Sequence, residues 1–330
     1  MTVYIRTDSN YKVGGGHLSR MLILAKELKL KRKKVIFLIK DTDQNGLRSI
    51  KKNFNVIQIP YRFNIKQEIK FLNNIFKEYK ISLIKDLYTI GNRWEKFFYE
   101  LNNIKLIVID DYTTVKHTCD FLINYSIYKK KPYTKFINKE CTILGGNKYI
   151  LIEPSFKFFK KAKKNKNIFL FFGSSDKLNL TTKYIKLLSD KSFSQYHKFV
   201  ITTSKNKNLL KIKKLIDSFE FCSTYELIVD TNNIAKYLSN SFFALTSGGT
   251  ISWEKIYYEV PSISVVTSDD QFYMTKTLAT KKKIYPIYDP TRLINKLKLI
   301  QLFNDVDKKF VFSSNFIDLK GAKRIYNAIN

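Results

Sequence analysis

Three glycines followed by a histidine, Gly14, Gly15, Gly16 and His17, are the residues of this sequence best suited to chemistry. Residues 3–6 predict a buried strand before them, and apolar residues at helical spacing predict a helix after them. A glycine loop between strand and helix presents N–H groups at the positive helix end, where anions bind. That helix end also favours neutral imidazole, so His17 is a candidate general base. The alternative is a histidine that only hydrogen-bonds its loop.

These glycines do not complete the dinucleotide-binding fingerprint G-x-G-x-x-G. Gly14 and Gly16 fit its start, but Ser19 takes the place of the last glycine. In addition, no acidic residue follows a clear second strand at the expected distance. We therefore do not expect NAD as a cofactor.

Histidine and cysteine are too scarce to suggest a metal site. The histidines are His17, His117 and His197, and the sequence offers no carboxylate cluster to complete a catalytic metal site. The three cysteines are widely spaced and form no C-x-x-C motif, so neither a disulfide framework nor a zinc site is suggested. We expect an activity without cofactor or metal. The cysteines are Cys119, Cys141 and Cys222.

A second glycine loop lies in the C-terminal half. Ser247, Gly248, Gly249 and Thr250 follow an apolar run and open a helix, so their N–H groups suit a diphosphate, with Thr250 as hydroxyl donor or cap. Glu254 comes one turn later, within reach of the hydroxyls of a ribose. Alternatively, the glycines only form a tight turn, and Glu254 is an acid that the helix dipole favours.

Gly173 and Ser174 begin a third loop, which continues to Asp176. A glycine followed by small residues lets a substrate approach the backbone closely. The same residues serve equally well as a helix cap.

Apolar runs of about four to six residues alternate with helical segments in both halves, as in doubly wound parallel sheets. The predicted strands are residues 3–6, 35–39, 56–59, 81–84, 106–109, 120–124 and 149–152, then 167–172, 199–202, 226–229, 242–245 and 262–266. A lysine-rich segment between the halves marks the junction. We predict an α/β fold of two Rossmann-like domains, residues 1–155 and 156–330, facing across a cleft.

The net charge of +31 is the most unusual bulk property. Such a charge suits nucleic acid, an anionic membrane or an acidic substrate. No nucleic-acid-binding motif accompanies the lysines, so we expect no nucleic-acid partner. A peripheral contact with an anionic membrane stays open, as does a compositional bias. No apolar run reaches about 18 residues and nothing resembles a signal peptide, so a cytoplasmic protein is expected.

Together these loops resemble the PseG-like UDP-sugar hydrolases of pseudaminic acid biosynthesis, a family with the GT-B fold of many glycosyltransferases. The resemblance is collinear through most of the chain and is weakest from about residue 40 to 103. It rests on Arg6-Thr-Asp-Ser9, Gly14-Gly-Gly-His17-Leu-Ser-Arg20, Ile109-Asp-Asp-Tyr112, Gly173-Ser-Ser-Asp176, Asn233-Ile-Ala235, Ser247-Gly-Gly-Thr250 with Glu254, Asp270-Gln271 and Lys320-Gly-Ala-Lys-Arg324.

The resemblance implies metal-free hydrolysis of a UDP-linked 2,4-diacetamido-2,4,6-trideoxy sugar with inversion. It implies that His17 activates water, that Asp8 orients the first loop and that Tyr112 lines the sugar site. In the second domain it implies a backbone contact of Ile234 with uracil, and a contact of Glu254 with ribose. The phosphates are expected at the glycine loops.

Two positions depart from the family pattern. Asp270-Gln271, at the expected sugar site, replaces an Asn-Gln pair, and Glu153 stands where the family usually has arginine. Both changes add negative charge near a polyanionic ligand, so they favour a different sugar or acceptor. One alternative is therefore a glycosyltransferase with a glycan or lipid-linked acceptor, in which His17 or Asp8 deprotonates the acceptor hydroxyl. Another is a non-catalytic nucleotide-sugar-binding protein.

Overall fold

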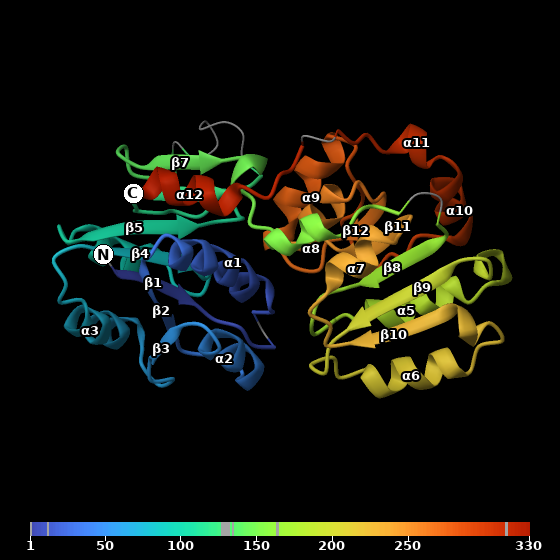
Figure 1. The fold of residues 1–330 in the computed structure, drawn as a ribbon, viewed down its shortest axis with the longest axis horizontal. Coiled ribbons are helices and arrows are strands. Elements are labelled where there is room, and N and C mark those ends of the chain that lie inside the picture. Colours follow the sequence, from blue (N-terminus) through green and yellow to red (C-terminus); the bar gives the residue numbers. More distant parts are fainter. Residues whose placement is uncertain (1, 12, 127–132, 134, 163–164, 314–315) are drawn as a thin grey trace. The chain divides into compact units, whose positions relative to one another are not determined.

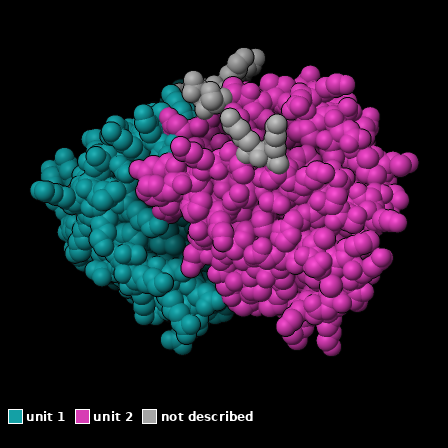
Figure 2. Space-filling view, turned by 45° about the vertical axis from the view of Figure 1, so that its right-hand side comes forward, with its two compact units in different colours: residues 1–152, 319–330 teal, residues 153–318 magenta. Residues whose placement is uncertain are grey.

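The computed structural model describes residues 2–11, 13–126, 133, 135–162, 165–313 and 316–330. The chain forms two compact units, each built on one sheet (Figure 1). Unit 1 consists of Met1–Ile152 with Leu319–Asn330, and unit 2 of Glu153–Asp318 (Figure 2). Among the described residues, every helix is too short or too polar to cross a membrane.

The sheet of unit 1 has seven parallel strands in the order β3-β2-β1-β4-β5-β6-β7. The strands are β1 (Thr2–Thr7), β2 (Lys34–Ile39), β3 (Asn55–Gln58), β4 (Ile81–Asp86), β5 (Ile104–Ile109), β6 (Phe121–Asn124) and β7 (Thr142–Gly145). A parallel sheet is covered on both faces, which explains why its strands are continuous apolar runs. In β4 even the polar residues Lys85 and Asp86 are buried.

Side chains cap the first turns of two helices of unit 1. Asp43 caps α2, and Asn64 forms a capping box with Gln67 at the start of α3. The helices are α1 (Gly16–Leu30), α2 (Gln44–Lys51), α3 (Ile65–Ile75), α4 (Asn92–Tyr99) and α12 (Gly321–Ile329).

Helix α12 belongs to unit 1 although it ends the chain. It packs beside α1 and against the short 3-10 helix η2 (Asn147–Tyr149) (Figure 1). A Cβ atom on Gly321 would lie 1.9 Å from the carbonyl oxygen of Ile150. Glycine is therefore required for this close approach.

Unit 2 has six parallel strands in the order β10-β9-β8-β11-β12-β13. These are β8 (Asn167–Phe171), β9 (His197–Thr202), β10 (Tyr225–Val229), β11 (Phe243–Ser247), β12 (Ser262–Val265) and β13 (Tyr285–Ile287). The helices are α5 (Leu180–Leu188), α6 (Leu209–Asp217), α7 (Ile234–Ser239), α8 (Ile251–Tyr257), α9 (Asp270–Thr280), α10 (Lys296–Asn304) and α11 (Val306–Lys309). The core lies between sheet and helices and includes Phe193, Phe243 and Phe303.

In each sheet the chain adds strands first toward one edge and then, from the centre, toward the other edge. In unit 1 the change falls between β1 and β4, and in unit 2 between β8 and β11. In open α/β sheets, ligands bind beyond the carboxyl ends of the strands at this switch point. The loops after these four strands are therefore the places to look for a site.

The predicted fold class is confirmed, and most predicted strands lie within a residue or two of their observed positions. The predicted closing strand at 149–152 is wrong, because β7 occupies Thr142–Gly145 and η2 follows it. The junction falls at residue 153, close to the predicted position, but residues 319–330 lie in unit 1 and not in the second domain. The cleft stays a prediction.

Candidate active site

His17 lies in the first turn of α1, at the switch point of unit 1. Gly14 has a φ of 82° and donates its N–H to the carbonyl oxygen of Asn10 over 2.8 Å, so the glycine loop is a tight turn. Gly15 occupies the N-cap position without a side-chain cap, and Gly16 begins the helix. This loop turns the chain from β1 into α1 and leaves His17 buried, with 8% of its surface exposed.

The imidazole of His17 pairs with the carboxylate that ends β4. Nδ1 of His17 lies 2.7 Å from Oδ1 of Asp86. Asp86 is fully buried and also accepts from Arg20, through Nε at 2.6 Å and Nη2 at 2.5 Å. Two short charge-assisted contacts from a rigid guanidinium fix the carboxylate in place. His17 is therefore held in one orientation.

The charge state of Asp86 determines which ring nitrogen of His17 is basic. Burial raises the pKa of Asp86, but Arg20 and His17 lower it more strongly, to about 2. The ionised carboxylate can only accept and lies 2.7 Å from Nδ1 of His17, closer than Nη2 of Arg20 at 3.3 Å, so we assign the proton to Nδ1. Nε2 is left as the proton acceptor, the arrangement that a general base needs.

Arg20 extends this cluster to the end of β5. Its Nη1 donates to Oδ2 of Asp111 over 2.7 Å, and the hydroxyl of Tyr88 donates to the same carboxylate. The ring of Tyr88 stands edge-on between those of His17 and Tyr112, at centroid distances of 4.7 and 4.8 Å. Tyr112, the predicted sugar-site residue, therefore belongs to the same cluster as His17.

Asp8 has a supporting position. Its carboxylate is buried, pairs with Arg6 at 2.7 Å and accepts from the backbone N–H groups of Lys40 and Asp41 at 2.7 and 2.9 Å. The hydroxyl of Thr42 donates to it as well. Four donors occupy this carboxylate, so it fastens the loop after β1 to the loop after β2. The geometry suits the orienting role and disfavours the alternative in which Asp8 is a base.

In unit 2, the glycine loop after β11 is held by Gln271. Ser247 ends β11 and is buried, and Gly248 donates to Val265 in β12 over 2.8 Å. Oε1 of Gln271 accepts from the N–H of Gly248 at 3.2 Å, and from the N–H and hydroxyl of Thr267, both at 3.0 Å. A Cβ atom on Gly248 would lie 2.4 Å from the hydroxyl of Thr275, so glycine is needed there.

Gln271, predicted to bind sugar, thus joins two loops through its carbonyl oxygen. Its Nε2 would lie 3.8 Å from a Cβ atom on Gly249, so its amide nitrogen is beside the glycine loop. Asp270 begins α9 next to it and is half-buried. Thr250 is the N-cap of α8 but makes no side-chain cap, which removes one of the two roles predicted for its hydroxyl.

Glu254 is half-buried in α8 and has an unusual acidity. Burial raises its pKa most, and the charge of Glu153 adds to this, giving a pKa of about 8. The aromatic residues after Glu153 hold that segment against α8. Phe156 stacks on Tyr258 at 5.5 Å, and the Tyr258 hydroxyl donates to the carbonyl oxygen of Phe156. The departure at Glu153 therefore acts directly on the predicted ribose-binding carboxylate.

The remaining predicted residues lie at the same edge of the unit 2 sheet or at a helix start. Gly173 follows β8 with a φ of 91°, and the carbonyl oxygen of Ser174 accepts from Thr203 at 2.6 Å. Asp176 accepts from two first-turn amides of α5, so the helix-capping interpretation of this loop is correct for Asp176. Ile234 begins α7 behind Asn233, whose side chain caps the helix.

The described part of the chain contains no group of three or more His, Cys, Asp and Glu residues that could hold a metal ion. The cysteines are closer in space than in sequence. The sulfur atoms of Cys119 and Cys141 lie 3.7 Å apart in unit 1, at hydrogen-bond distance, and both residues are free cysteines. The absence of a metal requirement stays a prediction.

No protein-family model matches this sequence. The chain is 28% identical over 259 residues to the UDP-2,4-diacetamido-2,4,6-trideoxy-β-L-altropyranose hydrolase of Campylobacter jejuni, covering 76% of this chain and 86% of that protein. This comparison confirms the resemblance read from the loops. Among solved structures, MurG of Acinetobacter baumannii superposes with a TM-score of 0.68 at 14% identity, over 100% of this chain and 99% of that one.

The chain has the GT-B fold. A second solved structure of this fold is WaaG, a glycosyltransferase involved in lipopolysaccharide biosynthesis, with a TM-score of 0.56 at 13% identity. It matches 99% of both chains. At these identities the superpositions establish the GT-B architecture and leave the chemistry to the residues of the site.

Sequence reasoning assigned no role to four residues of this GT-B site: Asp86, Arg20, Tyr88 and Asp111. A signal was present for Asp86, since a carboxylate at the carboxyl end of a buried parallel strand lies at the ligand-binding edge. The position of β4 next to β1 was the missing fact, because strand order is a property of the tertiary structure.

Proposed function

We propose that this GT-B protein is a nucleotide-sugar hydrolase, which cleaves the anomeric C–O bond of a UDP-linked diacetamido-trideoxy sugar with inversion. The observation that carries the proposal is the buried pairing of His17 with Asp86 at 2.7 Å, at the switch point of unit 1. The 28% identity with a hydrolase of this class supports it.

The His17–Asp86 pair supplies what an inverting hydrolysis needs. Nε2 of His17 takes a proton from water as the water oxygen bonds to the anomeric carbon. The bond between that carbon and the diphosphate oxygen breaks, and its electron pair leaves with UDP. The attack comes from the face opposite the leaving group, so the configuration inverts. Asp86 stabilises the imidazolium that forms.

Unit 2 would bind the leaving group. The loop from Ser247 to Thr250 is proposed to receive the diphosphate, whose growing charge it would stabilise without a protein acid. The N–H of Gly249 is the proposed donor, because the N–H of Gly248 already donates to Val265 and Gln271. Glu254 would accept from the ribose hydroxyls, and the backbone of Ile234 would contact uracil. Gly173 and Ser174 lie at the carboxyl end of β8, beside β11 in the sheet, and are proposed as further phosphate contacts.

A glycosyltransferase is the second candidate, favoured by Glu153 and Asp270, which depart from the hydrolase pattern. In that reaction His17 would deprotonate a glycan or lipid-linked hydroxyl in place of water. The net charge of +31 suits an acceptor at an anionic membrane.

Release of UDP from a panel of UDP- and CMP-activated sugars separates these functions. The panel includes the diacetamido-altrose donor and is measured with protein alone, with EDTA, and with added membrane extract. Free sugar from protein alone, unaffected by EDTA, supports the hydrolase, whereas loss of activity in EDTA contradicts the metal-free mechanism. Release only with extract supports a transferase. UDP binding without any turnover indicates a binding protein.

A further inference from the structure

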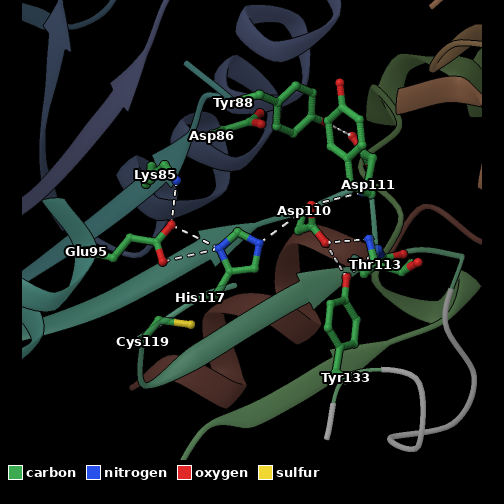
Figure 3. A network of polar contacts seen from close by, with 12 residues as sticks. Lys85, Asp86, Tyr88, Glu95, Asp110, Asp111, Thr113, His117, Cys119 and Tyr133 are labelled. Atoms are coloured by element: carbon green, nitrogen blue, oxygen red, sulfur yellow. Dashed lines mark hydrogen bonds and ion pairs between the residues drawn. The ribbon is translucent and has the colours of Figure 1, made fainter. Parts of the chain in front are cut away.

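Four charged side chains form a buried chain in unit 1 that the proposed reaction does not use (Figure 3). Nζ of Lys85 lies 2.5 Å from Oε1 of Glu95. Nδ1 of His117 lies 3.0 and 3.2 Å from the two oxygens of Glu95, and Nε2 lies 3.7 Å from Oδ1 of Asp110. Each of the four side chains has at most 5% of its surface exposed.

Nδ1 of His117 is hydrogen-bonded to Glu95, and Nε2, which has no hydrogen-bond partner among the described residues, lies within ion-pair distance of Asp110. A carboxylate beside each ring nitrogen favours the doubly protonated imidazolium. Burial lowers the pKa of His117, but the carboxylates of Asp110 and Glu95 raise it by a larger amount. The resulting pKa is about 9. The imidazolium and Lys85 then balance the two carboxylates. Loss of the proton would leave a net negative charge buried, which is costly. The other titratable groups nearby are Tyr133, which donates to Asp110, and Cys119, on which the charge of Glu95 acts.

Asp110 in turn holds a strained turn at the end of β5. It accepts from the N–H groups of Tyr112 and Thr113, both at 2.9 Å, and from the hydroxyl of Tyr133 at 2.5 Å. Thr113 has a φ of 74°. It is the only β-branched residue among the described non-glycine residues with positive φ, and such a conformation persists only where surrounding contacts enforce it.

The strained turn carries Asp111 and Tyr112, two members of the His17 cluster. The carboxylate of Asp111 accepts a hydrogen bond from Nη1 of Arg20. The other two nitrogens of Arg20 donate to Asp86. Asp110 contacts His117 and Tyr133 in the buried charge chain, whereas the next residue, Asp111, contacts Arg20 in the cluster. Contacts therefore run without a break from His117 through the turn to His17.

We infer that His117 is a positioning residue: by neutralising Asp110 it holds the Asp110–Thr113 turn, and through it the Arg20–Asp86–His17 arrangement. The inference rests on the proposed function for its effect on turnover, but its structural part is independent of any substrate.

The first test is NMR of the histidine ring nitrogens in full-length protein whose histidines carry a nitrogen isotope label. The chain has three histidines, so the variants His17→Gln and His197→Gln assign all the signals. Both nitrogens of His117 should stay protonated at neutral pH and lose a proton only near pH 9. A His117 ring that is neutral at pH 7 overturns the inference, and this measurement needs no variant of His117.

The second test follows His17 itself. In His117→Gln, the proton on Nδ1 of His17 should shift or broaden, because the Asp86 contact loosens. An unchanged His17 signal in folded His117→Gln overturns the inference whether or not the protein turns over a nucleotide sugar. The proposed function fails separately, if wild-type protein releases UDP from no sugar.

The third test measures turnover and rescue. His117→Gln should lower kcat about 10- to 100-fold, the cost of a small misplacement of catalytic groups, with UDP affinity unchanged. Adding Thr113→Gly should restore part of kcat, because glycine adopts positive φ without strain. His197→Gln, at a half-exposed histidine of unit 2, is the matched control. Wild-type kcat in His117→Gln, or a double variant no better than His117→Gln, overturns the inference.

Discussion

Oδ1 of Asp86 lies 2.7 Å from Nδ1 of His17, and two nitrogens of Arg20 donate hydrogen bonds to the same carboxylate. The strand that ends in Asp86 is separated from His17 by more than sixty residues of sequence. The pairing turns a histidine at a helix start into an oriented base. It also makes the base dependent on Arg20, which lies on the same helix α1, and on Asp86 at the end of β4.

His17→Gln should lower kcat about 10²- to 10⁴-fold, the range of general base catalysis. UDP affinity should be nearly unchanged, because the histidine is proposed to contact water and not the nucleotide. Kinetics and calorimetric UDP titration measure the two effects. His197→Gln is the control and should retain both. A parallel loss of UDP binding in His17→Gln would contradict the role of His17 as a base.

Asp86→Asn should lower kcat by about 10²- to 10⁴-fold, because an amide can stabilise the wrong tautomer of His17 and cannot balance an imidazolium. Asp111→Asn is the comparison: it also loses a contact with Arg20 but leaves the carboxylate beside His17. The decrease in kcat should be clearly smaller in Asp111→Asn than in Asp86→Asn. Equal losses in the two variants would mean that Arg20, and not the orientation of His17, is the sensitive element.

Acid stability should depend on Asp86. Its pKa is about 2 in the folded protein, against about 3.9 in an unfolded chain. A lowered folded pKa contributes stability that is fully present above the unfolded pKa and is lost as pH falls from about 4 through about 2. The contribution at neutral pH is about 2–3 kcal/mol. Urea unfolding at a series of pH values across this range measures the free energy of unfolding. Its dependence on pH should be weaker in Asp86→Asn than in the wild type.

UDP binding should respond to the two glutamates of unit 2. Ribose hydroxyls donate best to an ionised carboxylate, and Glu254 has a pKa of about 8. Affinity should therefore rise as pH increases from about 6 to about 8.5 and then level off. Glu153→Gln removes the charge that adds to the effect of burial on the pKa of Glu254, so affinity at pH 7 should increase and the pH dependence should move to lower pH.

Glu226→Gln is the matched control for Glu153→Gln, since Glu226 is an exposed glutamate of the same unit that pairs with His197. It should leave the pH dependence unchanged. Glu254→Ala should weaken UDP binding by about 1–3 kcal/mol, the value of a charged hydrogen bond. Calorimetry that finds equal affinity in Glu254→Ala removes this residue from the nucleotide site.

The sequence by itself determined the class of fold and the loops of the site. Alternating apolar runs and helical periodicity predict parallel strands, because such strands are buried on both faces. The glycines before His17 and after Ser247 predict tight strand-to-helix turns, because glycine adopts the backbone conformations that such turns require. These features depend on residues close together in the sequence, so they can be predicted from the sequence alone.

Tertiary structure alone decided which side chains meet. Asp86 became the partner of His17 because β4 lies beside β1, and strand order depends on how the whole sheet packs. Glu153 came to act on Glu254 through the packing of Phe156 on Tyr258. The return of α12 to unit 1 depends on the absence of a Cβ atom at Gly321. Such contacts join residues far apart in sequence, so no local pattern encodes them.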